Sequence, residues 1–257
     1  MSVAQAFDRG AARYDLMVAL NPGYHRELRR AAAALVERTE ICRRRGSPSV
    51  IDLPSIDIPP HDLSFIDLAC GSGASTRALV DAAPPRTAVL GLDASPGMLA
   101  QATAKDWPAE VRFDRAVAGT LDVDVIGRGR HDGVLTCYLF RNVAADQRDL
   151  AVRETYDLLR PGGWLVVQEY SVAGNPRARR VWDAVCLGVI IPLGILVDRN
   201  RDLYRYLWRS VLNFDPVDRF AERLLAAGFT DVAHRTATGW QRGVLHTFVA
   251  RKPDRST

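Results

Sequence analysis

The sequence predicts an α/β protein with a Rossmann-like sheet that is mostly parallel. Five short apolar segments alternate with segments that can hold helices, which is typical of a parallel sheet. They lie near 64–70, 86–92, 111–117, 133–139 and 163–169. The turn Gly71-Ser72-Gly73 follows the first segment, and Asp93 ends the second, 20 residues after Gly73. An acid at that distance is expected at the tip of the neighbouring strand, beside a nucleoside ligand.

The length and composition favour one soluble domain. The chain has 257 residues, of which 47% are hydrophobic and 25% are charged. We expect a single domain over 1–257, divided into five segments. They are a helical cap (1–41), a loop insert (42–62), a cofactor-binding core (63–171), a lid or substrate segment (172–214) and a C-terminal helix with a β-hairpin (215–257).

The cap is expected to contain two helices. Residues Ala4 to Leu20 can form the first, the run Asn21-Pro22-Gly23 breaks it, and the second follows from about Tyr24 to Arg38. The apolar stripe of this second helix contains Leu28, Ala32, Leu35 and Val36. Residues 42–62 include Pro59-Pro60 and show no sustained period, so a loop is expected there.

The segment 172–214 contains the most apolar stretch of the chain, Ala184 to Val197. Its 14 residues are too few to span a bilayer, and Pro192 is expected to interrupt them. One interpretation is a buried helix and loop. The other is a lid over an apolar substrate pocket that touches a membrane surface, because arginines flank the stretch on both sides. These are Arg177, Arg179, Arg180, Arg199 and Arg201.

The C-terminal segment carries clear helix and strand signals. Asp215 is expected to cap a helix that starts at Pro216 and ends at Gly228. Two strands, about 229–235 and 243–251, then form an antiparallel β-hairpin on the otherwise parallel sheet.

Charge and residue usage exclude several classes of partner. The net charge is +4 with a pI near 9.0, but the basic residues are spread along the chain, so no nucleic acid is expected. The four cysteines show no paired spacing and the histidines show no ligand spacing, so no disulfide framework and no metal are expected. No secretory signal is expected either, which predicts a cytoplasmic protein.

The glycine turn predicts a cofactor without a pyrophosphate. A dinucleotide-binding fingerprint would place a third glycine near position 76, where this chain has Thr76. S-adenosylmethionine is a nucleoside-bearing cofactor that lacks a pyrophosphate. Asp67, which precedes the turn, can accept a hydrogen bond from its amino group or order the glycine loop. Turn or capping roles for Asp67 and Asp93 remain the alternative.

Further runs of the chain match one enzyme family in order and spacing. They are Phe7-Asp8-x-x-Ala11-x-x-Tyr14-Asp15-Leu16-Met17, Phe140-Arg141-Asn142-Val143, Leu159-Arg160-Pro161-Gly162-Gly163, Arg201-Asp202-x-Tyr204-Arg205-Tyr206-Leu207 and Gly239 to His246. With the glycine turn, they resemble the class I S-adenosylmethionine-dependent methyltransferases. Within these the chain is similar to the ubiquinone/menaquinone-biosynthesis C-methyltransferases, and the resemblance covers nearly all of it.

The resemblance implies a set of cofactor-binding residues. They are Asp67, Ala69, Gly71, Gly73, Asp93, Ala94, Met98, Val117 and Ala118. The family usually has an acid where Val117 stands, to bind the adenine amine. Losing that hydrogen bond costs about 0.5–3 kcal/mol, roughly three- to a hundredfold in affinity. The 42–62 insert and Trp208, where the family tends to have proline, also depart from the pattern.

Ring methylation requires a group that stabilises a phenolate, and four residues are candidates for catalysis. Arg141 is expected to donate to the phenolate, since a guanidinium is a permanent cation and a poor base. Asn142 is expected to orient substrate or cofactor. Tyr14, like Tyr204, could line the pocket roof. His25 could be a base, as could His246, and for these aromatic and histidine side chains a structural role stays open.

Three functions remain open from the sequence. The first is methyl transfer to a ring carbon of a quinol or related polyphenol. The second is a methyltransferase of specialised metabolism that acts on an aromatic or polyketide oxygen or carbon. The third is a methyltransferase fold without transfer activity. A lipophilic aromatic substrate, peripheral membrane contact and a homodimer are the expected partners.

Overall fold

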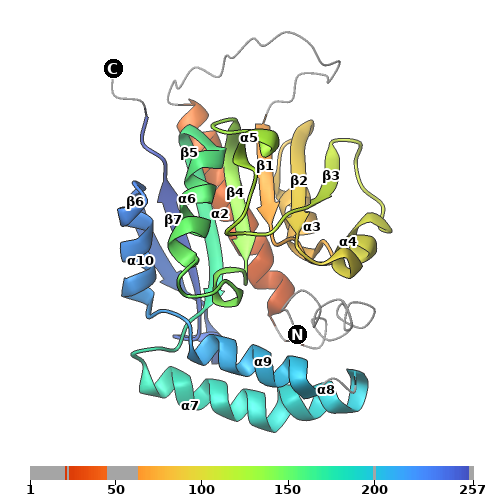
Figure 1. Ribbon diagram of the computed structural model, residues 1–257, viewed down its shortest axis with the longest axis vertical. Coiled ribbons are helices and arrows are strands. Elements are labelled where there is room, and N and C mark those ends of the chain that lie inside the picture. The colour runs from red at the N-terminus through yellow and green to blue at the C-terminus, as the bar shows by residue number, and fades with distance from the viewer. Residues whose placement is uncertain (1–20, 22, 45–62, 199–200, 255–257) are drawn as a thin grey trace.

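The sheet has the predicted topology. The computed structural model describes residues 21, 23–44, 63–198 and 201–254, and within them seven strands have the order β3-β2-β1-β4-β5-β7-β6 (Figure 1). The parallel strands are β1 (Leu63–Leu68), β2 (Thr87–Asp93), β3 (Val111–Arg115), β4 (His131–Cys137) and β5 (Leu159–Tyr170). The antiparallel strands β6 (Thr230–Thr236) and β7 (Leu245–Arg251) follow β5, which confirms the fold class and the C-terminal hairpin.

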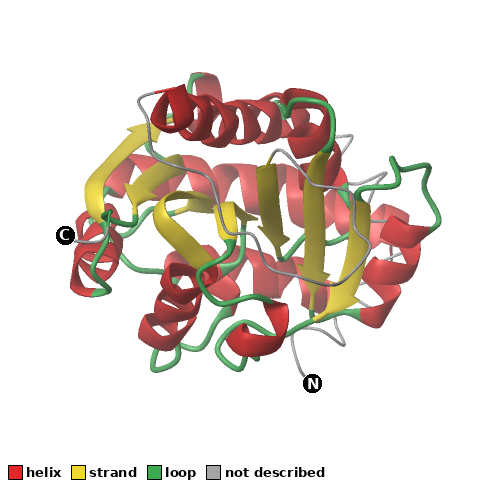
Figure 2. Ribbon diagram, turned by 90° about the horizontal axis from the view of Figure 1, so that it is seen from above, coloured by secondary structure: helices red, strands yellow, loops and turns green. Residues whose placement is uncertain are grey.

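Helices cover both faces of the sheet and create two hydrophobic cores (Figure 2). Helices α2 (Tyr24–Arg44) and α3 (Ala74–Ala82) contribute to one core. Helices α5 (Val123–Ile126), α6 (Arg148–Leu158) and α10 (Val217–Ala226) contribute to the other. Successive side chains of a strand point to opposite faces, so both sets are buried: in β1, Phe65 belongs to the first core and Ile66 to the second.

The cap helix is longer than expected. Helix α2 runs to Arg44, beyond the predicted end near Arg38 and into the segment expected to be a loop. Its C-terminal turn has contacts that extend it, since the Cys42 thiol lies 3.7 Å from the Gly162 carbonyl oxygen and 3.6 Å from Arg251 Nη2. The expected helix from Ala4 to Leu20 and the rest of the insert, 45–62, lie outside the described residues.

The segment after β5 forms a helical layer at the carboxyl ends of the parallel strands (Figure 1). It contains α7 (Pro176–Val185), the π-helical turn η2 (Cys186–Ile190), α8 (Ile191–Asp198) and α9 (Arg201–Leu212). Helix α8 and α9 pack closely at Gly194, where an added Cβ would overlap the ring of Tyr204.

The helical run continues through Pro192, contrary to expectation. A π-helical turn ends just before α8, and such turns accommodate a break in the regular hydrogen-bond pattern. By length and composition alone, Pro176–Val197 could cross a membrane, with a hydropathy of 1.9 and 17% of its most apolar window buried in the protein. The helical run that contains the apolar stretch is therefore longer than the 14 residues expected from the sequence.

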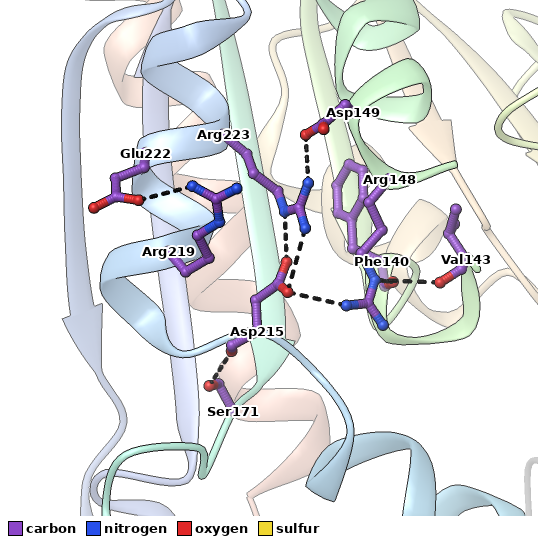
Figure 3. A network of polar contacts seen from close by, with 9 residues as sticks. All are labelled: Phe140, Val143, Arg148, Asp149, Ser171, Asp215, Arg219, Glu222 and Arg223. Atoms are coloured by element: carbon purple, nitrogen blue, oxygen red, sulfur yellow. Dashed lines mark hydrogen bonds and ion pairs between the residues drawn. The ribbon is translucent and has the colours of Figure 1, made fainter. Parts of the chain in front are cut away.

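Asp215 does not cap α10, so that prediction is wrong. The helix begins at Val217 with Pro216 at the N-cap position and no side-chain cap. Asp215 instead accepts hydrogen bonds from two guanidinium groups, at 3.1 Å from Arg148 Nη1 and 2.7 Å from Arg223 Nε (Figure 3). Charge-assisted bonds of this kind are roughly twice as strong as neutral ones, so they outcompete the backbone N–H groups of α10.

Gly133 in β4 provides a test of the packing between α2 and the sheet. An added Cβ would lie 2.7 Å from Leu35 Cδ1 and 2.9 Å from Phe65 Cδ1. We expect Gly133→Ala to lower the free energy of unfolding by about 1–3 kcal/mol, because the core must move apart. Chemical denaturation measures this change.

Gly188→Ala is the matched control. An added Cβ at this helical position meets nothing within 4 Å. Alanine is favoured over glycine in helices by about 1 kcal/mol, so this variant should be at least as stable as the parent protein. Equal stability of the parent and Gly133→Ala would contradict the packing between Leu35, Phe65 and β4.

Candidate active site

The candidate site lies where the strand order reverses. The chain runs from β1 outward to β3, then returns to β4 on the other side of β1. Ligands of such sheets bind at the carboxyl ends of the strands at this switch point. The glycine loop follows β1 there, and the 3-10 turn η1 (Phe140–Asn142) with Arg141 and Asn142 follows β4.

The glycine loop has the backbone shape that the sequence predicted. Gly71 and Gly73 have φ angles of 55° and 90°, a region that favours glycine. An added Cβ at Gly71 meets nothing within 4 Å, so the loop leaves open space at this point. Ala69 also has a positive φ, 66°, and a residue other than glycine is strained by about 1–2 kcal/mol in this conformation. The loop is thus built to expose its backbone.

Asp93 fixes the glycine loop from the end of β2. Its Oδ2 accepts a hydrogen bond from the Gly71 N–H at 2.8 Å, and its Oδ1 accepts one from the Ser95 N–H at 2.8 Å. Each carboxylate oxygen can accept more than one bond, so both can also take a ribose hydroxyl. Ala94 is half-buried beside it, and Met98 is buried in α4 (Pro96–Thr103), whose first turn Ser95 caps.

Asp67 is fully buried at the end of β1. Its Oδ2 accepts hydrogen bonds from the hydroxyls of Ser75 and Thr76, at 2.7 and 2.6 Å, which ties the start of α3 to the strand. Its Oδ1 is buried and has no hydrogen-bond partner among the described residues. Burial raises the pKa of Asp67 to about 6. This orphaned acceptor beside an open glycine loop suits an ammonium group, as S-adenosylmethionine carries.

The loop after β3 is held by a buried acid that the sequence analysis did not identify. Glu154 in α6 accepts hydrogen bonds from the Gly119 N–H at 2.6 Å and the Leu121 N–H at 2.8 Å. Val117 is 46% exposed in this loop, and Ala118 is half-buried next to it. Val117, at the position expected to bind the adenine, is therefore exposed and offers no carboxylate.

A cavity of about 330 Å³ lies between the turn η1, which contributes Arg141, and the helical layer. Aromatic and aliphatic side chains dominate its walls, and Arg141 is the one charged residue among the described residues that line it. The aromatic lining residues are Tyr24, Tyr138, Tyr170, Trp182, Tyr204 and Trp240. The apolar stretch of α7, η2 and α8 contributes Val185, Cys186, Val189, Ile190 and Leu193. The apolar stretch thus lines a cavity on one side, and its role as a lid stays a prediction.

Four of these rings form a continuous stack. The centroid distances are 5.6 Å from Tyr24 to Tyr138, 5.0 Å from Tyr138 to Tyr170 and 5.0 Å from Tyr170 to Trp182. Burial raises the pKa of Tyr138 and of Tyr170, so both hydroxyls stay protonated at neutral pH. Because the rings face one another, the stack contributes a rigid, largely apolar aromatic wall to the cavity and no phenolate base.

Arg141 is held by a buried carboxylate. Its Nη1 donates to Glu169 Oε1 at 2.7 Å and to the Tyr138 carbonyl oxygen at 3.1 Å. Glu169 is fully buried and also accepts from the backbone N–H groups of Arg141 and Tyr170. Because Glu169 offsets the charge of Arg141, the guanidinium faces the cavity as an oriented hydrogen-bond donor within a neutral pair.

Asn142 connects η1 to the helical layer. Its Nδ2 donates to the Tyr138 carbonyl oxygen at 2.8 Å, and its Oδ1 accepts from the Tyr206 hydroxyl of α9 at 3.1 Å. The turn is further held from behind, since Arg148 Nε donates to the carbonyl oxygens of Phe140 and Val143 (Figure 3). Arg148 belongs to the Asp215 network, which therefore supports the position of Arg141 and Asn142.

The remaining candidates differ in their position relative to the cavity. His25 is exposed on α2 and is not among the lining residues, although it touches the lining residue Tyr24. His246 is buried on β7 near His234 and Phe248, and burial lowers its pKa. Tyr204 lines the cavity as expected. Tyr14 lies outside the described residues.

No group of three or more His, Cys, Asp or Glu side chains that could hold a metal ion occurs in the described part of the chain. All four cysteines are free thiols.

Comparison with known proteins agrees with this geometry. The sequence profile of the ubiE/COQ5 methyltransferase family matches residues 1–252. The chain is 30% identical over 241 residues to the ubiquinone/menaquinone biosynthesis C-methyltransferase UbiE of Methylobacterium nodulans, covering 92% of this chain and 86% of that protein. It is 31% identical to the demethylmenaquinone methyltransferase of Mycolicibacterium vanbaalenii, covering 97% and 94%. The [4+2]-cyclase SpnF shares the fold with a TM-score of 0.65 at 16% identity, covering 98% of this chain and 95% of that one.

The buried acid Asp67 predicts a pH-dependent affinity for the cofactor product S-adenosylhomocysteine. Only ionised Asp67 can form an ion pair with the ligand ammonium, and its pKa is about 6. We therefore expect binding about tenfold weaker at pH 5 than at pH 7. Isothermal titration calorimetry of the protein and of Asp67→Asn checks this, and the variant should show a flat profile.

The exposed residue Asp81 in α3 gives the control, because Asp81→Asn should keep the parent's profile. An affinity that stays constant between pH 5 and pH 7 would mean that Asp67 only orders the loop.

The raised pKa of Asp67 also affects the stability of the protein without ligand. The folded state binds the Asp67 proton more tightly than the unfolded state does, so this side chain's contribution to stability falls as pH rises from about 4 to about 6.

Val117 predicts a gain of affinity on restoring the acid. Val117→Asp should tighten S-adenosylhomocysteine binding roughly three- to a hundredfold, because one more hydrogen bond to the adenine amine is formed. Val125→Asp introduces the same charge at an 82% exposed position of α5 and should leave the affinity unchanged. Equal affinities for the two variants would place the adenine elsewhere.

Proposed function

Because the chain belongs to the ubiE/COQ5 methyltransferase family, we propose that it methylates a ring carbon of a quinol or related polyphenol of the demethylmenaquinol kind. The chain is an enzyme, an S-adenosylmethionine-dependent methyltransferase. The observation that carries the choice of acceptor is the cavity between the turn η1 and the helical layer. It is apolar, has a stack of aromatic rings as a wall, and contains Arg141 as its charged lining residue among those described.

The cofactor half of the proposed site consists of rigid backbone and acids. Bound S-adenosylmethionine supplies an electrophilic methyl group. We assign the ribose to Asp93, the ammonium to Asp67 and the close backbone approach to Gly71 and Gly73. Asp93 already holds the Gly71 N–H at 2.8 Å, so this half is preorganised before the ligand arrives.

The acceptor half aligns a ring and stabilises its oxyanion. A phenol ring carbon becomes nucleophilic when the neighbouring hydroxyl loses its proton, and Arg141 is placed to donate to the developing phenolate. Asn142 and Tyr206 form a hydrogen bond that joins the turn to α9, so they would position the ring and the lid together. The apolar walls lower the local dielectric constant around a bound ring, which strengthens the donor effect of the guanidinium. The hydroxyl proton passes to water, and after methyl transfer the ring carbon loses its own proton to water as the ring regains aromaticity.

The partners of the protein and its location in the cell are also proposals. A small lipophilic aromatic substrate suits the cavity, whereas the homodimer and the cytoplasmic location stay predictions. The membrane contact gains a specific candidate surface from α7 and α8.

The direct test is a product analysis. The protein is incubated with S-adenosylmethionine and a demethylmenaquinol under reducing conditions, and mass spectrometry with NMR identifies the products. We expect S-adenosylhomocysteine and a quinol methylated on ring carbon. A product methylated on oxygen would contradict carbon transfer.

A substrate panel separates the alternatives in the same assay. Turnover of soluble aromatics alone would favour a role in specialised metabolism. Absence of turnover together with absence of S-adenosylhomocysteine binding at millimolar ligand would favour a fold without transfer activity, and the cyclase SpnF shows that a likeness in fold does not define a reaction.

Removal of the phenolate donor should slow catalysis without changing cofactor binding. Arg141→Gln alone would leave Glu169 buried and unpaired, at a cost of about 3–5 kcal/mol in stability. The double variant Arg141→Gln/Glu169→Gln keeps a neutral, hydrogen-bonded pair. We expect its kcat to fall about a hundred- to a thousandfold, with an S-adenosylhomocysteine affinity close to that of the parent.

Arg219→Gln is the control, since this arginine is exposed and pairs only with Glu222 on α10 in the contacts seen (Figure 3). Its kcat should match the parent's. A double variant that keeps the parent's kcat while losing stability would assign Arg141 a structural role.

A further inference from the structure

The run from α7 through α8 is apolar on two opposite faces. Its inner face lines the cavity with residues such as Trp182, Cys186 and Ile190. Its outer face is a stripe of exposed residues at helical spacing, which we call the outer stripe. The outer stripe consists of Arg177, Arg180, Val181, Ala184, Leu187, Gly188, Pro192, Ile195 and Leu196. Segments as apolar as η2 and α8 are normally buried, yet these lie in the outermost layer of the protein (Figure 1).

The exposed side chains of the outer stripe are large. Leu196 is 79% exposed, Leu187 54% and Ile195 41%, and they lie within three turns of one another. Contiguous apolar surface of this kind on a soluble protein marks a contact with a protein or a membrane. The inner face explains why the helix is apolar toward the cavity, but it does not explain the outer stripe.

The charges around the stripe favour a lipid surface. Arg177 and Arg180 form its N-terminal end on the same face as Val181 and Ala184. Over 173–212, the described side chains include five arginines and two aspartates. A helix with apolar residues next to arginines is the type that lies in the interface of a bilayer with anionic lipids.

The helix is fixed to the protein and therefore lies on the bilayer. Trp182 Nε1 donates to the Trp208 carbonyl oxygen at 3.2 Å, and Trp208 Nε1 donates to Asp183 Oδ1 at 2.8 Å. These bonds join α7 to α9, and the inner face is committed to the cavity. Insertion across the bilayer would break both.

We propose that the outer stripe docks the protein on an anionic lipid bilayer, with Leu187, Ile195 and Leu196 in the apolar boundary and Arg177 and Arg180 at the headgroups. The docking is inferred from the exposed residues of the outer stripe and does not depend on the proposed function. A further consequence rests on the proposed function: the helix that touches the bilayer also roofs the cavity, so a lipophilic acceptor passes from the bilayer to Arg141 beneath it.

Vesicle cosedimentation tests the docking. The full chain is mixed with vesicles of phosphatidylcholine alone or of equal parts phosphatidylcholine and phosphatidylglycerol. We expect binding to the anionic vesicles to be favoured, and Arg177→Gln/Arg180→Gln to weaken it about thirtyfold. Leu187→Asn/Leu196→Asn should weaken it about a hundredfold through lost apolar burial.

Leu225→Asn is the matched control, because Leu225 is 55% exposed on α10, away from the stripe. Its binding should equal the parent's, and thermal unfolding should show all variants folded. Failure of the parent to bind anionic vesicles, or unchanged binding by the leucine variant, would overturn the proposal. So would light scattering that shows the stripe joining two copies of the chain without vesicle binding.

An activity assay tests the docking and the proposed function independently of each other. The leucine variant should lose turnover of a long-chain demethylquinol embedded in vesicles and keep turnover of a short-chain, water-soluble one. If the parent binds vesicles but methylates neither quinol, the docking stands and the proposed acceptor is wrong. If it methylates both quinols equally without vesicle binding, the docking is wrong and the acceptor stands.

Discussion

Strands β2 and β3 lie on one side of β1 and strands β4 and β5 on the other, and this reversal of order leaves a crevice at the carboxyl ends of β1 and β4. The glycine loop enters the crevice from β1, and the turn with Arg141 enters it from β4. The helical layer after β5 lies across this end of the sheet, at the bottom of Figure 1. One topological feature thus brings a cofactor loop, an oriented cation and an apolar roof together from segments far apart in the sequence.

Buried carboxylates give this crevice its fixed shape. Asp67 holds the start of α3, Glu154 holds the loop after β3, and Glu169 holds Arg141. Each accepts two or more hydrogen bonds, which is the condition under which a buried charge is tolerated. The roof is different in kind, because it is built from apolar contacts that carry little directional constraint. The site therefore combines a rigid cofactor half with an adaptable acceptor half.

The parts of the site that depend on short-range spacing were predicted from the sequence. Gly71, Gly73 and Asp93 lie in a local motif whose geometry hardly varies. The structure gives both glycines the expected positive φ angles and shows Asp93 in the turn role, while its contact with a ribose stays a prediction. Glu169 was missed because its partner Arg141 is distant in sequence, although an acid at the end of an apolar strand was a signal. Asp215 was misassigned since its local context is that of a cap, whereas two arginines of other elements claim it.

The contact between Gly194 and Tyr204 lies at the wall of the cavity that we propose for the acceptor. Helix α8 reaches α9 closely only because residue 194 has no side chain, and Tyr204 lines the cavity on the other side of that contact. A methyl group at 194 would have to displace the tyrosine ring or lift the helix, while the glycine loop and Arg141 would keep their places. If the proposed acceptor site is right, position 194 offers protein engineers a way to change acceptor size without altering Arg141 or the glycine loop.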